Sequence, residues 1–256
     1  MLEKRLRLWS GVIVMLYVIP HLLNHSLGLI SLNAMESMRL VMASIWRDPP
    51  GAIIFLGAFV LHFFLSLFSL YRRNTLRMPI WEGAQISLGI LIFPLLLGHI
   101  IGTQGVAKVI GFMPTYEYVI AAIWVSDPIR GVQQTFVMFV VWGHMCMGLH
   151  FWLRLKRWYR KWLPFYYGLA ILIPVTAFLG FARVGRELAI ASEQTPGYLA
   201  RIFKPITQAD PNLVATLQSL EPNIFLFFGF VVVTVFLARI VRRVYRNRHG
   251  VYNLSL

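Results

Sequence analysis

The sequence predicts an all-α, polytopic membrane protein with six transmembrane helices, and three observations support this. Of the 256 residues, 58% are hydrophobic and only 13% are charged, which is too apolar for an ordinary soluble domain. Six nearly uncharged runs approach or exceed the roughly 20 residues that a helix needs to cross the hydrocarbon core of a bilayer. The Lys and Arg residues are concentrated between these runs.

The predicted spans follow one another along the whole chain. They cover residues 9–32, 51–71, 84–103, 131–153, 163–182 and 224–241. The first run is too long for the apolar region of a signal peptide, so we expect a retained helix. Aromatic side chains at span ends, such as Trp158, Tyr159 and Trp162, are typical of membrane-interface anchors.

The segments on the predicted outer side are longer than those on the inner side. Two of them contain mixed apolar and polar stretches, at 34–46 and 116–124, that are too short to cross a membrane. These stretches are either interfacial helices that cap the bundle or loops packed on the helix ends. The third segment has turn residues at 192–197 and is expected to be an ordinary loop.

Charge gives the direction of insertion. With the N-terminus inside, sixteen of the 24 Lys and Arg residues fall in inner segments, together with only two of the ten acids. The positive-inside rule therefore predicts that both termini are cytoplasmic. The same distribution explains the formal charge of +14 without a nucleic-acid partner.

The chain is expected to be one six-helix unit over residues 1–249. Its single cysteine, Cys146, lies inside the fourth span, so there is neither a disulfide framework nor a motif for covalent haem attachment. Residues 250–256 alternate in a strand-like pattern. They are either the start of a missing soluble domain or a tail.

Six of the seven histidines lie within the first four predicted spans. They are His21, His25, His62, His99, His144 and His150. A single intramembrane imidazole is commonly a core residue that hydrogen-bonds to a neighbouring helix. Six in four consecutive helices predict a cofactor site, a proton path or an ion path, because polar side chains are costly at membrane depth.

Helical rise sorts these histidines by depth. At about 1.5 Å per residue, His21 and His99 lie roughly 18 and 22 Å from the inner ends of their spans, in the outer half of the bilayer. His62 and His144 lie roughly 16 and 20 Å from the outer ends of theirs, in the inner half. Because a haem with two axial ligands needs imidazoles at one height, we predict an outer haem held by His21 and His99 and an inner haem held by His62 and His144. These outer and inner pairs join the diagonals of a four-helix bundle.

Two histidines remain. His25 is one turn beyond His21 on the same face, so it is the alternative outer ligand or a partner for a haem propionate or a quinone. His150 lies about 28 Å into the fourth span, near the inner surface, and is expected to be a propionate or interface partner.

Cations near the membrane boundary are candidates for neutralising haem propionates. Arg183 and Arg186 lie on the outer side, against the positive-inside trend, and are the preferred candidates. At the inner side the candidates are Arg72 and Arg154, whose alternative role is ordinary snorkelling.

Small and polar residues complete the candidate set. Glycines near the histidines would let a macrocycle approach the helices, although they also serve plain helix packing. They are Gly57, Gly98, Gly102, Gly143 and Gly148. For a quinone the candidates are Gln104, Tyr116 and Asp127, with packed loop residues as the alternative.

Local motifs in the first 155 residues resemble the cytochrome b membrane anchor of succinate dehydrogenases and fumarate reductases. They are His21-Leu-Leu-Asn, His62 followed by Leu65-Ser-Leu, and His144 followed by Gly148-Leu. The resemblance implies two haem b groups with His21, His62, His99 and His144 as ligands.

Over nearly the whole chain, the sequence resembles the N-terminal anchor of bacterial class III adenylate cyclases. The likeness rests on 21-HLLNHSLGLIS-31, 71-YRRNTLRMP-79 and 148-GLHFWLRL-155. It implies a homodimer in the bacterial inner membrane that couples a quinone or another redox signal to C-terminal ferredoxin-like and cyclase domains. Residues 251–256 would then open the ferredoxin-like domain, and this chain alone would not make cyclic AMP.

Two other functions remain open from the sequence. One is a free-standing cytochrome b subunit of a quinone-linked respiratory oxidoreductase. The other is a metal or proton transporter lined by histidines, although the first four spans offer no Asp or Glu and only one Cys as further metal ligands.

Overall fold

The computed structural model describes residues 2–248, and all its regular structure is helical. Six helical stretches are long and apolar enough to cross a membrane. Their main helices are α1 (Leu2–Ser26), α3 (Gly51–Arg72), α4 (Ile80–Ile100), α7 (Pro128–Leu153), α9 (Leu163–Gln194) and α11 (Pro211–Arg248). The predicted membrane character and helical fold class are therefore confirmed. The expected strand-like segment 250–256 lies outside the described residues.

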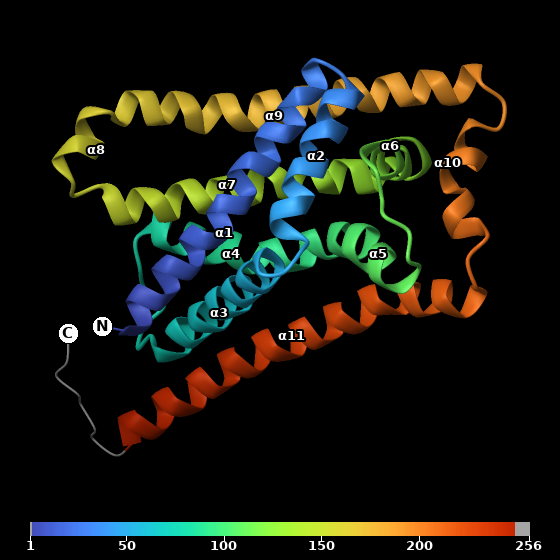
Figure 1. Cartoon of the computed structure of the whole chain (residues 1–256). Coiled ribbons are helices and arrows are strands. Elements are labelled where there is room, and N and C mark those ends of the chain that lie inside the picture. The colour runs from blue at the N-terminus through green and yellow to red at the C-terminus, as the bar shows by residue number, and fades with distance from the viewer. Residues whose placement is uncertain (1, 249–256) are drawn as a thin grey trace.

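Shorter helices join the long ones. The 3-10 turn η1 (Leu27–Leu29) follows α1, and α4 continues through the π-helix η2 (Ile101–Gly105) into α5 (Val106–Val109). The others are α2 (Leu32–Trp46), α6 (Tyr116–Ile120), the π-helix η3 (Ala121–Ser126), α8 (Arg157–Lys161) and α10 (Tyr198–Thr207). In Figure 1, α8 links α7 to α9 near the N-terminus, and α10 links α9 to α11 at the opposite end.

The closest packing between long helices is that of α1 with α3, α1 with α9 and α4 with α7. Helix α11 contacts α3 and α4. At one end, α11 binds the last turn of α3, where Arg239 Nε donates to the Arg73 carbonyl at 3.0 Å and Arg242 to the Tyr71 carbonyl at 3.2 Å. These contacts satisfy carbonyls that a helix C-terminus leaves without partners.

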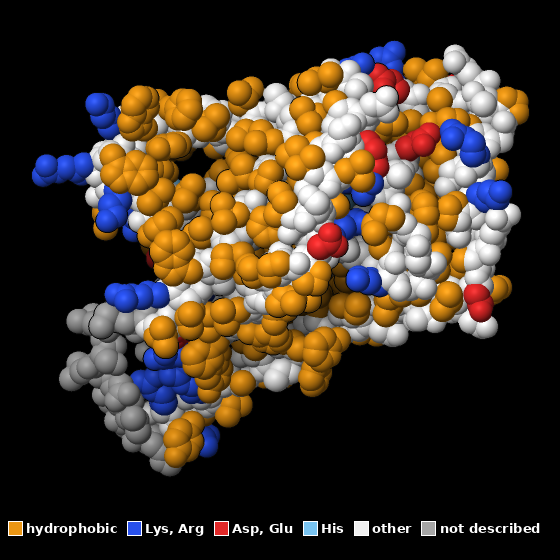
Figure 2. Space-filling view, viewed as in Figure 1, with side chains coloured by type: hydrophobic (Ala, Val, Ile, Leu, Met, Phe, Trp, Pro, Cys, Tyr) orange, Lys and Arg blue, Asp and Glu red, His pale blue; other side chains and the backbone are white. Residues whose placement is uncertain are grey.

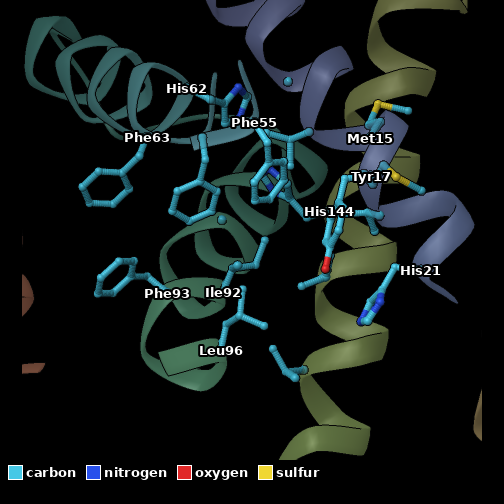
Figure 3. Close-up of a pocket in the computed structure, with 18 of the residues that line it drawn as sticks. Met15, Tyr17, His21, Phe55, His62, Phe63, Ile92, Phe93, Leu96 and His144 are labelled. Carbon is cyan, nitrogen blue, oxygen red and sulfur yellow. The ribbon is translucent and has the colours of Figure 1, made fainter. Parts of the chain in front are cut away.

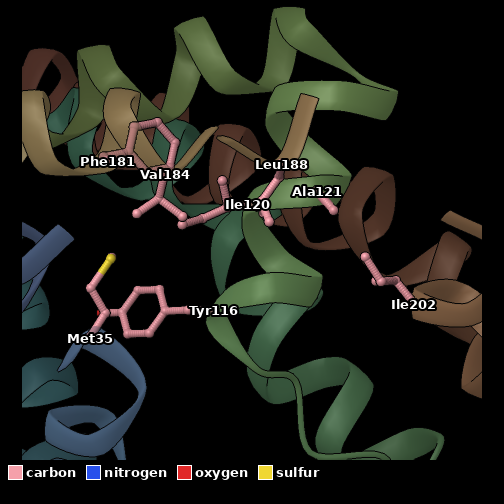
Figure 4. Close-up of a cluster of buried hydrophobic side chains, with 8 residues drawn as sticks. All are labelled: Met35, Tyr116, Ile120, Ala121, Phe181, Val184, Leu188 and Ile202. Atoms are coloured by element: carbon pink, nitrogen blue, oxygen red, sulfur yellow. The ribbon is translucent and has the colours of Figure 1, made fainter. Parts of the chain in front are cut away.

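The two short outer stretches are helices packed on the end of the bundle. The hydroxyl of Ser31 caps α2 by accepting from the Ala34 N–H, and Thr115 caps α6 through the Tyr118 N–H, as expected for N-cap residues. Their apolar faces meet α9 and α10 in one cluster (Figure 4). It contains Met35, Tyr116, Ile120, Ala121, Phe181, Val184, Leu188 and Ile202.

Helix boundaries differ from the predicted spans. Helix α1 begins at Leu2 rather than at residue 9, α9 extends to Gln194 rather than 182, and α11 begins at Pro211 rather than 224. The predicted loop around 192–197 is helical to Gln194, and only residues 195–197 form a turn, with Gly197 at φ 77°, before α10 begins at Tyr198. Good helix formers such as Leu, Ala, Glu and Arg continue these helices past the apolar run, which an uncharged-run criterion cannot detect.

Charged side chains are distributed unevenly over the molecule. In Figure 2, Lys and Arg gather at the end that carries the N-terminus, while the acids visible on this face lie over the other part together with further cations. Hydrophobic side chains cover most of the surface between the ends. This is the pattern on which the predicted orientation rests.

Candidate cofactor site

A large cavity lies between α1, α3, α4 and α7, and it brings the predicted histidines together. Its volume is about 1070 Å³, and its lining includes His21, His25, His62, His99 and His144. Figure 3 shows His21, His62 and His144 projecting into this space beside apolar side chains such as Phe55 and Phe63. The cavity is thus a mainly apolar chamber with imidazoles from four helices.

The outer pair faces across this chamber. The ring centroids of His21 and His99 are 6.0 Å apart. The His21 ring stacks on Tyr17, with centroids 5.4 Å apart and an interplanar angle of 14°, and meets His25 edge-on at 4.8 Å. Ring packing is therefore what the structure shows holding His21.

His25 is more enclosed than its neighbour. It is 8% exposed and packs edge-on against Tyr116 and Phe181. Its buried Nδ1 has no hydrogen-bond partner. A ring close to His21, with an unsatisfied nitrogen, keeps His25 as the alternative outer ligand.

The inner pair is held by hydrogen bonds as well as by packing. The centroids of His62 and His144 are 6.3 Å apart. His62 Nδ1 lies 2.9 Å from the carbonyl oxygen of Arg7, and His144 Nδ1 lies 3.0 Å from that of Gln85. Because a carbonyl only accepts, each Nδ1 carries the proton and each Nε2 keeps its free electron pair for a metal.

Both pairs have the spacing expected for two imidazoles on one metal ion. A metal to nitrogen bond of about 2.0 Å and about 1.2 Å from that nitrogen to the ring centroid give roughly 6.4 Å between opposed rings. The residues 2–248 contain no group of three or more His, Cys, Asp or Glu side chains that could hold a metal ion. Two protein ligands per site suit haem iron, because the porphyrin supplies the other four nitrogens.

Two glycines make the inner arrangement possible. A Cβ on Gly11 would lie 2.9 Å from His62 Cε1, and a Cβ on Gly89 would lie 2.9 Å from His144 Cε1. Such distances are too short for carbon atoms in contact. Neither glycine is among the predicted ones, of which only Gly148 lines the cavity.

The cations that face the cavity are largely different from the predicted ones. Arg154 lines it, as proposed, but Arg72, Arg183 and Arg186 are not among the lining residues. The full cationic lining is Lys4, Arg7, Arg39, Arg47, Arg73, Lys108 and Arg154. It divides into Arg39, Arg47 and Lys108 near α2 and α5, and the other four at the end that carries the N-terminus.

Arg183, Arg186 and His150, three of the predicted residues, do not line the cavity. Arg183 donates to the carbonyls of Gly28, Leu29 and Ile30 and pairs with Glu187 at 2.9 Å, so it caps the end of η1. Arg186 is exposed. His150 Nδ1 lies 3.1 Å from the Tyr159 hydroxyl on α8.

A polar network borders the outer pair. Asn24, which is 1% exposed, donates to the Tyr116 hydroxyl at 3.1 Å, and the Tyr116 N–H donates to Glu36 at 3.1 Å. Partial burial alone would raise the pKa of Glu36, but the hydrogen bonds from Arg39 and Tyr116 outweigh it and hold the pKa below its ordinary value. Burial raises the pKa of the Tyr116 phenol, which therefore stays protonated.

A second cavity of about 310 Å³ lies against His99 on the flank of the bundle. It is lined by α4, η2, α6, η3, α7 and α11, and its polar groups include Asp127, Gln133 and Gln218. On its wall, Arg130 and Glu221 form a two-pronged ion pair at 2.6 and 3.0 Å that joins α7 to α11. Of the proposed quinone contacts, Asp127 faces this cavity, whereas Gln104 and Tyr116 face the large one.

No protein-family model, curated protein or solved structure matches this chain.

Proposed function

We propose that this chain is the membrane domain of a dihaem b-type cytochrome that carries electrons between the two sides of a membrane. The observation that carries the proposal is that two pairs of imidazoles share one mainly apolar cavity. Within the two pairs the ring centroids are 6.0 and 6.3 Å apart. An ordinary protein metal site has three or four protein ligands. Two opposed imidazoles from different helices suit the two axial positions of a haem iron.

In this proposal His21 and His99 hold the outer haem, and His62 and His144 hold the inner one. Haem supplies one-electron transfer, which no side chain of the cavity provides alone. The protein orients the four imidazoles and keeps most of the chamber apolar with side chains such as Phe55 and Phe63.

The cations of the cavity support the fit, because each haem b carries two propionate groups. Arg39, Arg47 and Lys108 lie toward the outer pair, where they can neutralise one set of carboxylates. Arg7 and Arg154, with Lys4 and Arg73, can do the same at the inner pair. These assignments replace Arg183, which donates to backbone carbonyls and pairs with Glu187, and Arg186, which is exposed; neither lines the cavity.

The cavity beside His99 is a place for an electron donor or acceptor. It combines an apolar wall with Asp127, Gln133 and Gln218, which can hydrogen-bond to carbonyl or hydroxyl oxygens. A quinone headgroup has this chemistry, and His99 would separate it from the outer haem. This supports, as part of the proposal, a quinone at the outer side.

The resemblance to cyclase anchors extends the proposal to signalling. The domain would sit in a bacterial inner membrane, as part of a homodimer, and report the redox state of the membrane to C-terminal ferredoxin-like and cyclase domains. Helix α11 would be the connection, because it contacts the bundle along its length and ends in a basic segment. In a protein that carries these domains, cyclic AMP formation should depend on redox poise, and His62→Ala should remove that dependence.

The central test is the visible spectrum of the purified chain, oxidised and reduced, with pyridine haemochromogen quantitation. We expect a b-type spectrum with two haems per chain. His62→Ala and His144→Ala should each leave only the outer haem, and His21→Ala and His99→Ala only the inner one. His150→Ala is the matched control, because His150 lies in a span but does not line the cavity; it should keep both haems.

Three results would change the proposal. A chain that binds no haem when haem is supplied would overturn it. One haem per chain would contradict the assignment of two pairs. Two haems in His21→Ala, together with one in His25→Ala, would move the outer ligand to His25.

A further inference from the structure

The protein holds the two histidine pairs in different ways. Both imidazoles of the inner pair place Nδ1 within hydrogen-bond distance of a backbone carbonyl, that of Arg7 for His62 and that of Gln85 for His144. Within residues 2–248, neither ring of the outer pair hydrogen-bonds to the protein, and His21 is held by stacking on Tyr17. The difference lies in the groups around the ligands, not in the ligands themselves.

The same local motif produces both inner contacts. In α1 the accepting carbonyl belongs to Arg7 and the glycine four residues later is Gly11, whereas in α4 the two positions are Gln85 and Gly89. Residues four apart are neighbours on one helix face. A Cβ on either glycine would come within 2.9 Å of the imidazole, so each glycine opens the carbonyl beneath it to a histidine of another helix.

Hydrogen bonding to the second nitrogen of a ligating imidazole changes the metal. When Nδ1–H donates to a carbonyl, the ring becomes more basic and Nε2 a stronger electron donor. A stronger donor stabilises the oxidised iron, which carries the additional positive charge, and so lowers its reduction potential. Two such bonds act on the inner pair, and none from the protein acts on the outer pair.

Charge near the cavity is positive at both ends. Three cations, Arg39, Arg47 and Lys108, line the outer part, and Arg39 pairs with Glu36. Four cations line the inner part, and one of them, Arg73, pairs with Glu82. Each end thus has at least two further cations for the two propionates of a haem, and the hydrogen bonds to the imidazoles are the asymmetry at the ligands themselves.

We infer that the carbonyls of Arg7 and Gln85, opened by Gly11 and Gly89, are positioning groups that give the inner haem a lower reduction potential than the outer haem. The inference rests on the proposed dihaem function. It gives the domain a direction, because electrons that enter at the inner pair are then held more favourably at the outer pair, next to the cavity beside His99.

The test is a spectroscopic redox titration of the full chain and of two single-haem variants. The haem that remains in His62→Ala, which is the outer one, should be half-reduced at a higher potential than the haem that remains in His21→Ala. Equal potentials or the reverse order would overturn the inference. If the chain binds no haem, the proposed function itself is wrong, and the absorption spectrum shows this before any titration.

A glycine variant tests the cause. Gly89→Ala should push His144 away from the Gln85 carbonyl and raise the reduction potential of the inner haem alone. At a fixed ambient potential, the ratio of reduced to oxidised inner haem should rise roughly fivefold, which is the effect of about one hydrogen bond. Gly83→Ala is the matched control, because Gly83 lies on the same helix as Gly89 and a Cβ there would meet no atom within 4 Å. An unchanged inner potential in Gly89→Ala would overturn the role of the carbonyl; if that variant loses the inner haem, Gly11→Ala makes the same test at His62.

Discussion

Replacing Phe228 with alanine should loosen the last helix from the bundle. Phe228 is 8% exposed and stacks on Phe93, with ring centroids 4.7 Å apart and an interplanar angle of 13°. It also lies 5.9 Å from Phe63, and all three rings line the large cavity. The aromatic cluster of Phe63, Phe93 and Phe228 is thus the apolar seat of α11 on α3 and α4.

The cost of this change comes from lost van der Waals packing. In lipid or detergent the side chain is surrounded by apolar groups in either state, so the hydrophobic effect does not contribute. Alanine removes roughly 100 Å³ of side chain, and about 24 cal/mol for each Å³ of residual cavity gives about 2.4 kcal/mol. Losing a stacked aromatic pair adds about 0.5–1.5 kcal/mol. We therefore expect the free energy of unfolding to fall by about 3 kcal/mol.

The assay is reversible unfolding in mixed detergent micelles, followed by tryptophan fluorescence. Phe225→Ala and Phe227→Ala are the controls, because these residues of the same helix are 53% and 65% exposed. Both should change the free energy of unfolding by about 0.5 kcal/mol or less. If Phe228→Ala costs no more than these two variants, the aromatic seat does not hold α11 and the reasoning is wrong.

Three further predictions concern polar contacts. Glu36 has a lowered pKa, so its ion pair with Arg39 stabilises the fold above the unfolded pKa near 4.5 and is lost as the pH falls through the folded pKa. Glu36→Gln should therefore lower the free energy of unfolding by about 1–2 kcal/mol at pH 7, and this difference should shrink as the pH falls below 4.5. Glu187→Gln, in an exposed pair, should have little effect at pH 7. A double-mutant cycle of Arg130→Gln and Glu221→Gln in the same unfolding assay should give a coupling energy of about 1 kcal/mol. A coupling energy near zero would mean that this ion pair does not stabilise the contact between α7 and α11. Trp142→Phe, which breaks the 2.7 Å bond from Nε1 to an α9 carbonyl, should cost about 0.6–1.7 kcal/mol, and an unchanged unfolding midpoint would contradict it.

Sequence alone predicted the membrane character and the helical class, because length and hydrophobicity dominate the energetics of crossing a bilayer. It also placed His21 with His99 and His62 with His144, since depth follows from counting residues along helices. It could not predict that Arg39, Arg47 and Lys108 line the cavity. These residues come from segments between the predicted spans, whose packing depends on how α2 and α5 fold over the bundle, and neither hydropathy nor charge counting contains that information.

Gly11 and Gly89 were not predicted as part of the site because the predicted starts of their helices were wrong. Counted from predicted starts at residues 9 and 84, Gly11 and Gly89 lie only about 3 and 8 Å from the inner ends of their helices, too shallow for His62 and His144. Counted from the observed starts at Leu2 and Ile80, both lie about 14 Å in. His62 and His144 lie about 15 and 14 Å from the observed C-terminal ends of α3 and α7, so each glycine and its histidine share one height. The charged first turns of α1 and α4, which an apolar-run criterion discards, are therefore what brings the Arg7 and Gln85 carbonyls to the level of the inner imidazoles.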